Sequence, residues 1–380
     1  MPFHPFVSRF GTALLGALTC FAPATADAEA GPIVEFPVAY PGAPEPPPPG
    51  KGCPHRQGST HEITHDEKHG GDLWVTGQNY DQLVQVGLDG GMTFHAMPKG
   101  SGPHGIEFDA EGALWLTLEF QGKIVRIEAR GPNAGKIARE FDADLHAEGA
   151  AAKIPTNPHG LGIGADGKTV WFTGKATGTI GRITPDGKVA TFPLQTVGAV
   201  PIYIKLGPDG NMWVTELVGN KIARVSPAGE IKEFAIPTAN SRPIAIVPGP
   251  DGRMWFSQEA GNKVARIDAE GKIEEFPVPK MQDNMILAGL AFDGDGNLWT
   301  QQYVDAARPF PAGPDYLVKI DQKILKAAPG EISEIPITFY RVPTENTVMH
   351  RIHRGPDGNL WFTELKADKV GRLSVAGAKP

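Results

Sequence analysis

The chain of 380 residues contains 36 basic and 43 acidic side chains, which gives a formal net charge of −7, and 41% of its residues are hydrophobic. This balance excludes a nucleic-acid-binding protein that depends on neutralising phosphates, and the apolar content excludes a disordered chain. The 47 glycines and 36 prolines interrupt almost every window in which a helix could form. An all-β protein with many turns is therefore predicted.

The N-terminal segment 1–28 has the layout of a secretory signal peptide. Arg9 is followed by an apolar run from Thr12 to Ala22 and then by small residues suited to cleavage. The run is too short to span a membrane, so we expect a periplasmic or secreted protein without a membrane span. Cys20 would be removed with this segment, which leaves Cys53 without an intramolecular partner.

All seven tryptophans occupy the same point of one pattern that recurs about every 42 residues. The clearest copies contain GPDGNMWVTE, GPDGRMWFSQ or GPDGNLWFTE. Each copy reads as four short strands, with an Asp-Gly hairpin turn before the Trp-led strand. Seven copies of a four-stranded unit predict a seven-bladed β-propeller. The tryptophans are Trp74, Trp115, Trp171, Trp213, Trp255, Trp299 and Trp361.

The propeller is expected to occupy residues 31–380 as a single domain. The last copy, around Trp361, ends after its third strand, and residues 33–38 (IVEFPV) match the missing fourth strand. Pairing of the two would close the ring and remove free sheet edges. The alternative is that residues 33–38 form a loose tail. Residues 40–59, which include the run Pro46 to Pro49, are interpreted as a stiff link to blade one.

Two copies are longer than the others. The additional residues fall at Asp142 to Thr156, between blades two and three, and at Tyr303 to Pro314, after the Trp strand of blade six. If strands alternate in direction, both loops emerge on the face where each first strand begins. That face is the candidate functional face, because loops on a rigid scaffold carry binding and catalytic residues.

The residue that opens each first strand should line the central channel. Blades seven, one, two and three carry histidine there, whereas blades four, five and six carry apolar residues. A single such histidine is usually structural, but four in register, in a chain with 11 histidines, indicate a site. In blade order the residues are His61, His104, His159, Ile202, Ile244, Ala288 and His350.

The Trp strands run back towards the same face, and several end in polar residues. Glu216, Glu364 and Tyr303 are further candidates for the substrate channel, with hydrogen bonds to neighbouring backbone as the alternative role of the two glutamates. Glu119, in WLTLE, stands one residue later than the glutamate of WVTE and WFTE. On a strand this offset turns the carboxylate to the opposite side. A bulge would then aim Glu119 at the channel and at His104.

This repeat resembles that of the virginiamycin B lyases, the streptogramin-inactivating seven-bladed propellers, from about Ile33 to the C-terminus. The resemblance implies a histidine that opens one blade, an acidic-Pro-His-Gly string that opens the next, and a glutamate that ends that blade's Trp strand. His61 in THEIT, His104 in GPHGI and Glu119 in WLTLE match these positions.

In the family, the acidic residue before the Pro-His pair and the strand-end glutamate bind Mg²⁺. Here Gly102 stands at the acidic position, so the resemblance leaves Glu119 as the Mg²⁺ ligand. Glu62 follows His61 directly, but on a regular strand neighbouring side chains point to opposite sides.

The implied reaction is an elimination that opens the ester of a small molecule such as a cyclic depsipeptide. A histidine with a pKa near neutrality can remove the proton next to a carbonyl group, and a divalent ion or a cationic donor stabilises the charge on the carbonyl oxygen. We expect His104 to act as the base and His61 as a second acid/base or orienting group. The protein is expected to be a monomer.

Two other classes of function remain open. A propeller lactonase or esterase would add water to an ester through a metal-bound water. A non-catalytic propeller would use the two-sided channel and the loop after Trp299 to hold a ligand or a protein.

Two further motifs have simpler explanations. Residues 61–65 (HEITH) match the zinc-protease motif, but that chemistry requires a helix, and a strand is predicted here. His65 and His69 leave room for an adventitious metal site beside blade one. Asp-Gly pairs such as Asp209-Gly210 and Asp357-Gly358 are typical of hairpin turns and do not require calcium.

Overall fold

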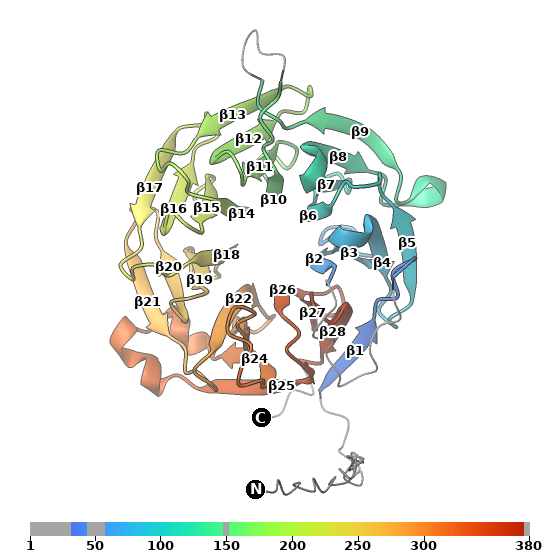
Figure 1. Ribbon diagram of the computed structural model, residues 1–380. Coiled ribbons are helices and arrows are strands. Elements are labelled where there is room, and N and C mark those ends of the chain that lie inside the picture. Colours follow the sequence, from blue (N-terminus) through green and yellow to red (C-terminus); the bar gives the residue numbers. More distant parts are fainter. Residues whose placement is uncertain (1–31, 44–57, 147–151, 376–380) are drawn as a thin grey trace, which may run out of the picture. The chain divides into compact units, whose positions relative to one another are not determined.

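The computed structural model describes residues 32–43, 58–146 and 152–375. These residues form seven four-stranded antiparallel sheets, arranged as the blades of a propeller around a central channel (Figure 1). The predicted seven-bladed all-β fold is therefore confirmed. The predicted signal peptide, Cys53 and most of the Pro-rich link lie outside the described residues. No helix within the described ranges is long and apolar enough to cross a membrane.

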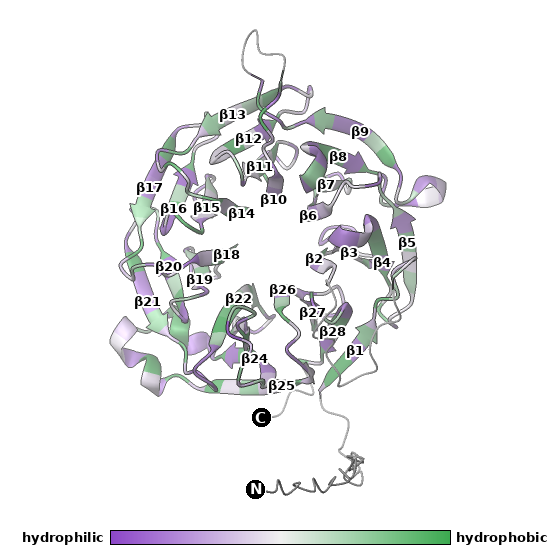
Figure 2. Ribbon diagram, in the orientation of Figure 1, coloured by the Kyte–Doolittle hydropathy of each residue, from purple (hydrophilic) through white to green (hydrophobic). Residues whose placement is uncertain are grey.

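Each blade places one strand at the channel and one at the circumference, where hydrophobic and hydrophilic residues alternate (Figure 2). The innermost strands are β2 (Thr60–Thr64), β6 (Pro103–Phe108), β10 (Pro158–Ile163), β14 (Pro201–Leu206), β18 (Pro243–Pro248), β22 (Met285–Phe292) and β26 (Met349–Arg354). The Trp strands are β3 (Leu73–Gly77), β7 (Leu114–Leu118), β11 (Val170–Gly174), β15 (Met212–Glu216), β19 (Met254–Gln258), β23 (Leu298–Val304) and β27 (Leu360–Glu364). The third strands are β4 (Gln82–Val86), β8 (Lys123–Ile127), β12 (Thr179–Ile183), β16 (Lys221–Val225), β20 (Lys263–Ile267), β24 (Pro314–Ile320) and β28 (Lys369–Leu373). The outermost strands are β5 (Met92–Ala96), β9 (Ile137–Asp142), β13 (Val189–Pro193), β17 (Ile231–Ala235), β21 (Ile273–Pro277), β25 (Ile337–Glu345) and β1 (Ile33–Pro37).

The N-terminal strand β1 completes blade seven. It pairs antiparallel with β28, from Ile33 opposite Leu373 to Pro37 opposite Lys369. The carboxylate of Glu35 lies 2.9 Å from the buried Lys369 ammonium group. The predicted closing strand is therefore confirmed, and the loose-tail alternative is excluded.

Every tryptophan packs in the same way within its blade. Its indole ring lies against a ring of the outermost strand, as with Trp213 and Phe234, whose centroids are 5.9 Å apart. In blades two, four, five, six and seven the indole N–H also donates to the aspartate of the preceding turn, for example from Trp213 to Asp209 at 2.9 Å. Each of these aspartates therefore stabilises a hairpin turn, which explains the Asp-Gly pairs without calcium.

The first strand of every blade contains a break in its register. In β14, Pro201 and Ile204 are paired with β15, whereas Ile202 and Tyr203 between them are not. The N–H of Tyr203 is instead bound by the hydroxyl of Thr215 at 3.1 Å, and this hydroxyl donates to the carbonyl of Ile244 in the next blade at 2.8 Å. The same residue of each Trp strand, two after tryptophan, accepts the N–H of the break: Thr76, Thr117, Thr173, Thr215, Ser257, Gln301 and Thr363.

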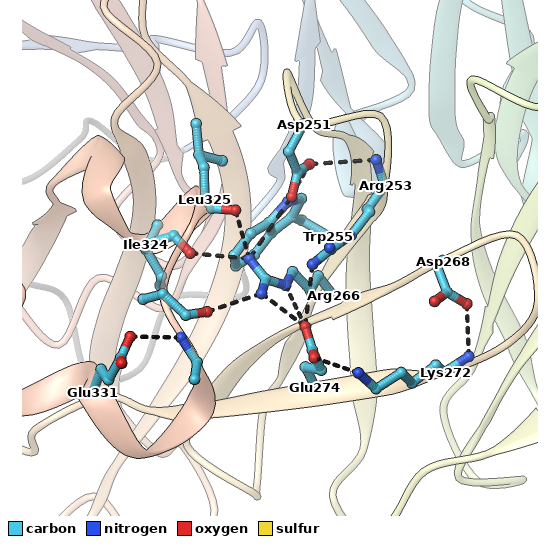
Figure 3. Close-up of polar contacts among 12 residues, drawn as sticks. Asp251, Arg253, Trp255, Arg266, Asp268, Lys272, Glu274, Ile324, Leu325 and Glu331 are labelled. Carbon is cyan, nitrogen blue, oxygen red and sulfur yellow. Dashed lines mark hydrogen bonds and ion pairs between the residues drawn. The ribbon is translucent and has the colours of Figure 1, made fainter.

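Blade six contains two insertions. The predicted loop follows β23, and a second segment, residues 321–336, joins β24 to β25 and contains the 3-10 helices η4 (Gln322–Leu325) and η5 (Pro329–Glu334). Figure 3 shows how Arg266 of β20 holds this second segment through the carbonyl groups of Ile324 and Leu325, at 3.1 and 2.7 Å, while Glu274 neutralises the guanidinium group. Three other 3-10 helices are η1 (Gln78–Tyr80), η2 (Glu119–Gln121) and η3 (Gly131–Asn133).

Replacing Thr215 by valine should destabilise the propeller. The isosteric change leaves the Tyr203 N–H and the Ile244 carbonyl without their shared partner, at a cost of about 2–4 kcal/mol for two buried polar groups. Denaturant unfolding measures the difference. Thr215→Ser retains the hydroxyl, as Ser257 does in blade five, and should unfold close to the wild type. Equal loss in both variants would contradict the bridging role.

Candidate active site at the channel mouth

The four histidines predicted to share the channel mouth come together. The ring centroids of His61 and His104 are 5.0 Å apart, those of His104 and His159 are 3.8 Å apart, and those of His61 and His350 are 5.1 Å apart. They are contributed by the neighbouring strands β26, β2, β6 and β10 (Figure 1). In each of these strands the histidine is the first residue of the register break. The corresponding residues of the other three blades are Ile202, Ile244 and Ala288.

Burial determines the charge state of this histidine cluster. Burial lowers the pKa of His104 to about 3, and burial together with neighbouring histidines lowers the pKa values of His61 and His159 well below the usual range. The expectation that the base has a pKa near neutrality is therefore wrong for His104, because its ring is removed from water. These three imidazoles are neutral at neutral pH.

Glu62 also faces the channel. Its carboxylate accepts a hydrogen bond from the Tyr203 hydroxyl at 2.5 Å and lies 3.1 Å from Nε2 of His350 and 3.3 Å from Nε of Arg351. The expectation that Glu62 points away from His61 is wrong, because both residues fall in the break between Thr60 and Ile63, where the strand alternation is lost.

Glu62, Tyr203 and Arg351 form a second layer beneath the histidines. Each is the second residue of its register break, in β2, β14 and β26, and the Arg351 guanidinium group lies 4.2 Å from the centre of the Tyr203 ring. Burial by itself would raise the pKa of Glu62, but Arg351 and His350 hold it well below the usual range. The carboxylate is therefore ionised beside the neutral rings. Each of the three directly follows the residue that opens its first strand, which is His61, Ile202 or His350, and this position is the sequence signal for the layer.

Glu119 lies at the mouth beside His104. It is the first residue of η2, and β7 before it pairs with β8 in unbroken register as far as Leu118 and Lys123. The predicted bulge is therefore absent, and Glu119 reaches the mouth because it follows the end of the strand. Its carboxylate accepts hydrogen bonds from Gln78 at 2.7 Å and from Lys175 at 3.0 Å. Gln78 and Lys175 are likewise the fourth residues after the tryptophans of their blades, and this spacing is the sequence signal for both.

Glu216 and Glu364 are not part of the histidine cluster. Each is the last residue of its Trp strand, fully buried, and stands one residue before the position of Glu119. Glu216 lies beside the Lys221–Glu233 ion pair, and Glu364 lies beside Glu35 and Lys369. Their predicted place in the substrate channel is wrong, because the one-residue offset directs them into their own blades.

Tyr303 is buried in β23 of blade six, next to blade seven, which carries His350. Its hydroxyl donates to Glu259 at 3.4 Å, and Glu259 in turn lies 2.9 Å from Arg242. Glu259 occupies the same position in blade five that Glu119 occupies in blade two. The strand-end pattern does not single out Glu259, because Gln258 stands at the last strand position of this blade.

The two histidines of HEITH do not converge. His61 belongs to the histidine cluster. His65 follows the other end of β2, where its Nδ1 lies 2.7 Å from Nε2 of His353. His69 instead pairs with Asp66 at 2.9 Å. Because the segment is a strand, the zinc-protease geometry is absent from it.

A cavity of about 510 Å³ occupies the other end of the channel. It is lined by the far halves of the innermost strands, among them Lys205, Glu107 and His353, and by Arg351. Arg351 also contacts Glu62, so the layer of Glu62, Tyr203 and Arg351 separates this cavity from the histidines. The convergent polar groups lie at the histidine end, which is therefore the candidate active site.

The fold and this site define a seven-bladed β-propeller with a histidine-lined channel mouth. Residues 133–307 match the model of the virginiamycin B lyase family. A virginiamycin B lyase from Nocardia farcinica (strain IFM 10152) is 31% identical over 145 residues, which are 37% of this chain and 45% of that protein. The matched region therefore spans somewhat less than half of this curated relative.

Solved structures give the same result over a longer range. A streptogramin B lyase structure is 25% identical with a TM-score of 0.70, covering 90% of this chain and 97% of that one. A catalytically inactive histidine-to-alanine variant of virginiamycin B lyase from Staphylococcus aureus with quinupristin is 26% identical with a TM-score of 0.70, covering 90% and 99%. The resemblance predicted from the repeat is confirmed: this protein is a β-propeller similar to the virginiamycin B lyases.

Replacing Glu216 by glutamine should remove a pH dependence of stability. Burial raises the pKa of Glu216 to about 8 from an ordinary value of 4.5. The folded state therefore keeps a proton that the unfolded state releases, and its stabilising effect is lost as the pH rises through this window. At pH 7.5 the variant should be more stable than the wild type by on the order of 2 kcal/mol, and at pH 4 the two should be equal.

Denaturant unfolding at both pH values measures this difference. Gln258, the equivalent residue of blade five, already donates an amide hydrogen bond to Glu275 at 2.8 Å. The reverse change Gln258→Glu should therefore lose stability at pH 7.5. Parallel pH profiles of wild type and Glu216→Gln would contradict the assignment.

Proposed function

We propose that this protein is an exported lyase of the virginiamycin B lyase kind, which opens an ester linkage of a cyclic depsipeptide by elimination. The observation that carries the proposal is the convergence of His61, His104 and Glu119, the residues that the resemblance implies, at one channel mouth. The rings of the two histidines are 5.0 Å apart, and ligand atoms of His104 and Glu119 lie within 4.8 Å of each other. The relative with quinupristin, inactive after loss of one histidine, supports a histidine-dependent reaction.

In the proposed reaction His104 removes the proton next to the carbonyl group. The electron pair of that C–H bond forms the alkene while the neighbouring C–O bond breaks, and the ester oxygen leaves as a carboxylate, with His61 as a second acid/base. Nδ1 of His61 lies 2.8 Å from the carbonyl oxygen of Ser59, which can only accept, so Nδ1 carries the proton and Nε2 is free. Nδ1 of His104 has no hydrogen-bond partner among the described residues. Each ring therefore offers one nitrogen that can accept a proton.

Glu62 stabilises the imidazolium that this step forms. Its negative charge raises the pKa values of both His61 and His104, against the larger lowering that burial causes. A buried imidazolium is costly unless a carboxylate compensates it. Glu62 thus acts on the base as a charge partner, without touching the reacting bond.

Lys175 can stabilise the negative charge that develops on the carbonyl oxygen. Its ammonium group lies 3.0 Å from Glu119, and its charge lowers the pKa values of His104 and His159, which shows that it stands near both. A cationic donor aimed at a developing oxyanion lowers the barrier to proton abstraction.

The residues present do not fit Mg²⁺. Gly102 has a φ of 57°, and a Cβ atom there would lie 2.4 Å from the ring of Phe120, so an acidic side chain at this position would be strained. Glu119 is then the remaining oxygen donor of the implied pair, whereas Mg²⁺ prefers a shell of oxygen ligands. No step of the proposed reaction is therefore assigned to Mg²⁺.

Incubation of the purified protein with quinupristin tests the proposal. Elimination should give a linear product with the mass of the substrate and a new alkene, which mass spectrometry and ultraviolet absorption detect. His104→Ala and His61→Ala should each lower the rate by roughly 10²–10⁴-fold, the usual contribution of an acid/base residue. His65→Ala, at the other end of the channel, should retain the wild-type rate.

Other outcomes separate the remaining classes of function. A product heavier by one water would indicate an esterase or lactonase. Binding of quinupristin without turnover would indicate a non-catalytic propeller. An intact macrocycle, under conditions in which an authentic lyase opens it, would overturn the proposed substrate.

A further inference from the structure

The ligand atoms around His104 suit a metal ion other than Mg²⁺. His104, His159 and Glu119 each offer one ligand atom, and these atoms all lie within 4.8 Å of one another. The three residues are 3%, 6% and 4% exposed. Two imidazoles and one carboxylate form a donor set typical of Zn²⁺ and neighbouring transition metals, which bind at about 2.0–2.2 Å.

His104 lacks the partner that a buried polar atom normally has. Its Nδ1 atom is buried, and nothing in the described part of the chain hydrogen-bonds it. Most buried polar atoms in proteins are paired, so an unpaired one points to a missing ligand.

Glu119 is the residue that an incoming ion must share. Its carboxylate is occupied by Lys175, whose side chain is 39% exposed. A flexible, partly exposed lysine can turn into solvent at little cost. We propose that His104, His159 and Glu119 bind a divalent transition-metal ion of the zinc class, and that Lys175 competes with this ion for Glu119.

A second set, Glu62, His104 and His350, is also close enough to hold an ion. Here the competing cation is Arg351, whose side chain is 10% exposed and lies over the Tyr203 ring. Arg351 is much less exposed than Lys175, and removing its carboxylate partner would leave a buried guanidinium group uncompensated. The set with Glu119 is therefore the one that can exchange a cation.

Three protein ligands leave one position of a tetrahedral ion open. Such an open position is typical of zinc sites that bind a water or a substrate oxygen, and it would lie at the channel mouth. The inference concerns metal binding alone and does not depend on the proposed elimination. A bound ion would occupy the lone pair that His104 uses as a base, so the proposed elimination belongs to the metal-free protein.

Titration of the chelator-treated full-length protein with Zn²⁺ and with Co²⁺ tests the site. Calorimetry should give one Zn²⁺ ion per chain, and Co²⁺ should produce the visible absorption of a low-coordinate ion. His159→Ala and Glu119→Gln should weaken Zn²⁺ binding by roughly a hundredfold or more. Lys175→Met should strengthen it by about tenfold, because the competing charge is removed. His65→Ala controls for the second histidine pair and should bind as the wild type does.

Several results would overturn the inference. Failure of the protein to bind Zn²⁺ is one, and binding of Mg²⁺ as tightly as Zn²⁺ is another. Loss of Zn²⁺ binding in Glu62→Gln, with binding retained in Glu119→Gln, would also exclude the proposed ligands. Near-ultraviolet circular dichroism checks that each variant is folded. If His159→Ala does not fold, Lys175→Met decides, since unchanged or weaker binding in that variant would exclude a shared carboxylate. A lyase without the metal site would still open quinupristin, which keeps the two tests separate.

Discussion

The hydrogen bond from a Trp-strand side chain to the register break of its blade is the constraint on which the channel depends. A register break removes an N–H group from the sheet, and a buried N–H without a partner costs about 1–3 kcal/mol. Thr215 and its equivalents bind that N–H, and several also bind a carbonyl group of the next blade. Because the break is stabilised in this way in every blade, two consecutive residues face the channel instead of one.

Two layers of different chemistry follow from these breaks. The first residues bring four imidazoles together, and the second residues bring Glu62, Tyr203 and Arg351 together beneath them. Burial keeps the rings of His61, His104 and His159 neutral, while the ionised carboxylate of Glu62 is balanced by Arg351. A proton or a cation in the cluster can therefore bind a lone pair of a neutral imidazole, and the negative charge of Glu62 compensates the added positive charge. This combination favours acid/base chemistry and metal binding in the same small volume.

The likeness to the virginiamycin B lyases extends over the whole propeller, but the site departs from the family pattern in its ligands. Gly102 replaces an acidic residue, and the ring of Phe120 occupies the space that such a side chain would need. His159, from the adjacent blade, stands instead against His104. The departure replaces an oxygen donor by a nitrogen donor, which is the basis of the proposed preference for a transition-metal ion.

The sequence by itself determined the number of blades, the closing strand and the histidine side of the channel, because the Trp strands and Asp-Gly turns recur with a local period. It also identified Glu119, although through a bulge that does not form. Only the tertiary structure revealed Glu62, Tyr203, Arg351 and Lys175, and it moved Glu216 and Glu364 out of the channel. Tyr203 contacts Glu62 across 141 residues of sequence. Such contacts depend on where a strand breaks its alternation and on which blades face each other across the ring, and neither property is contained in the spacing of a repeat.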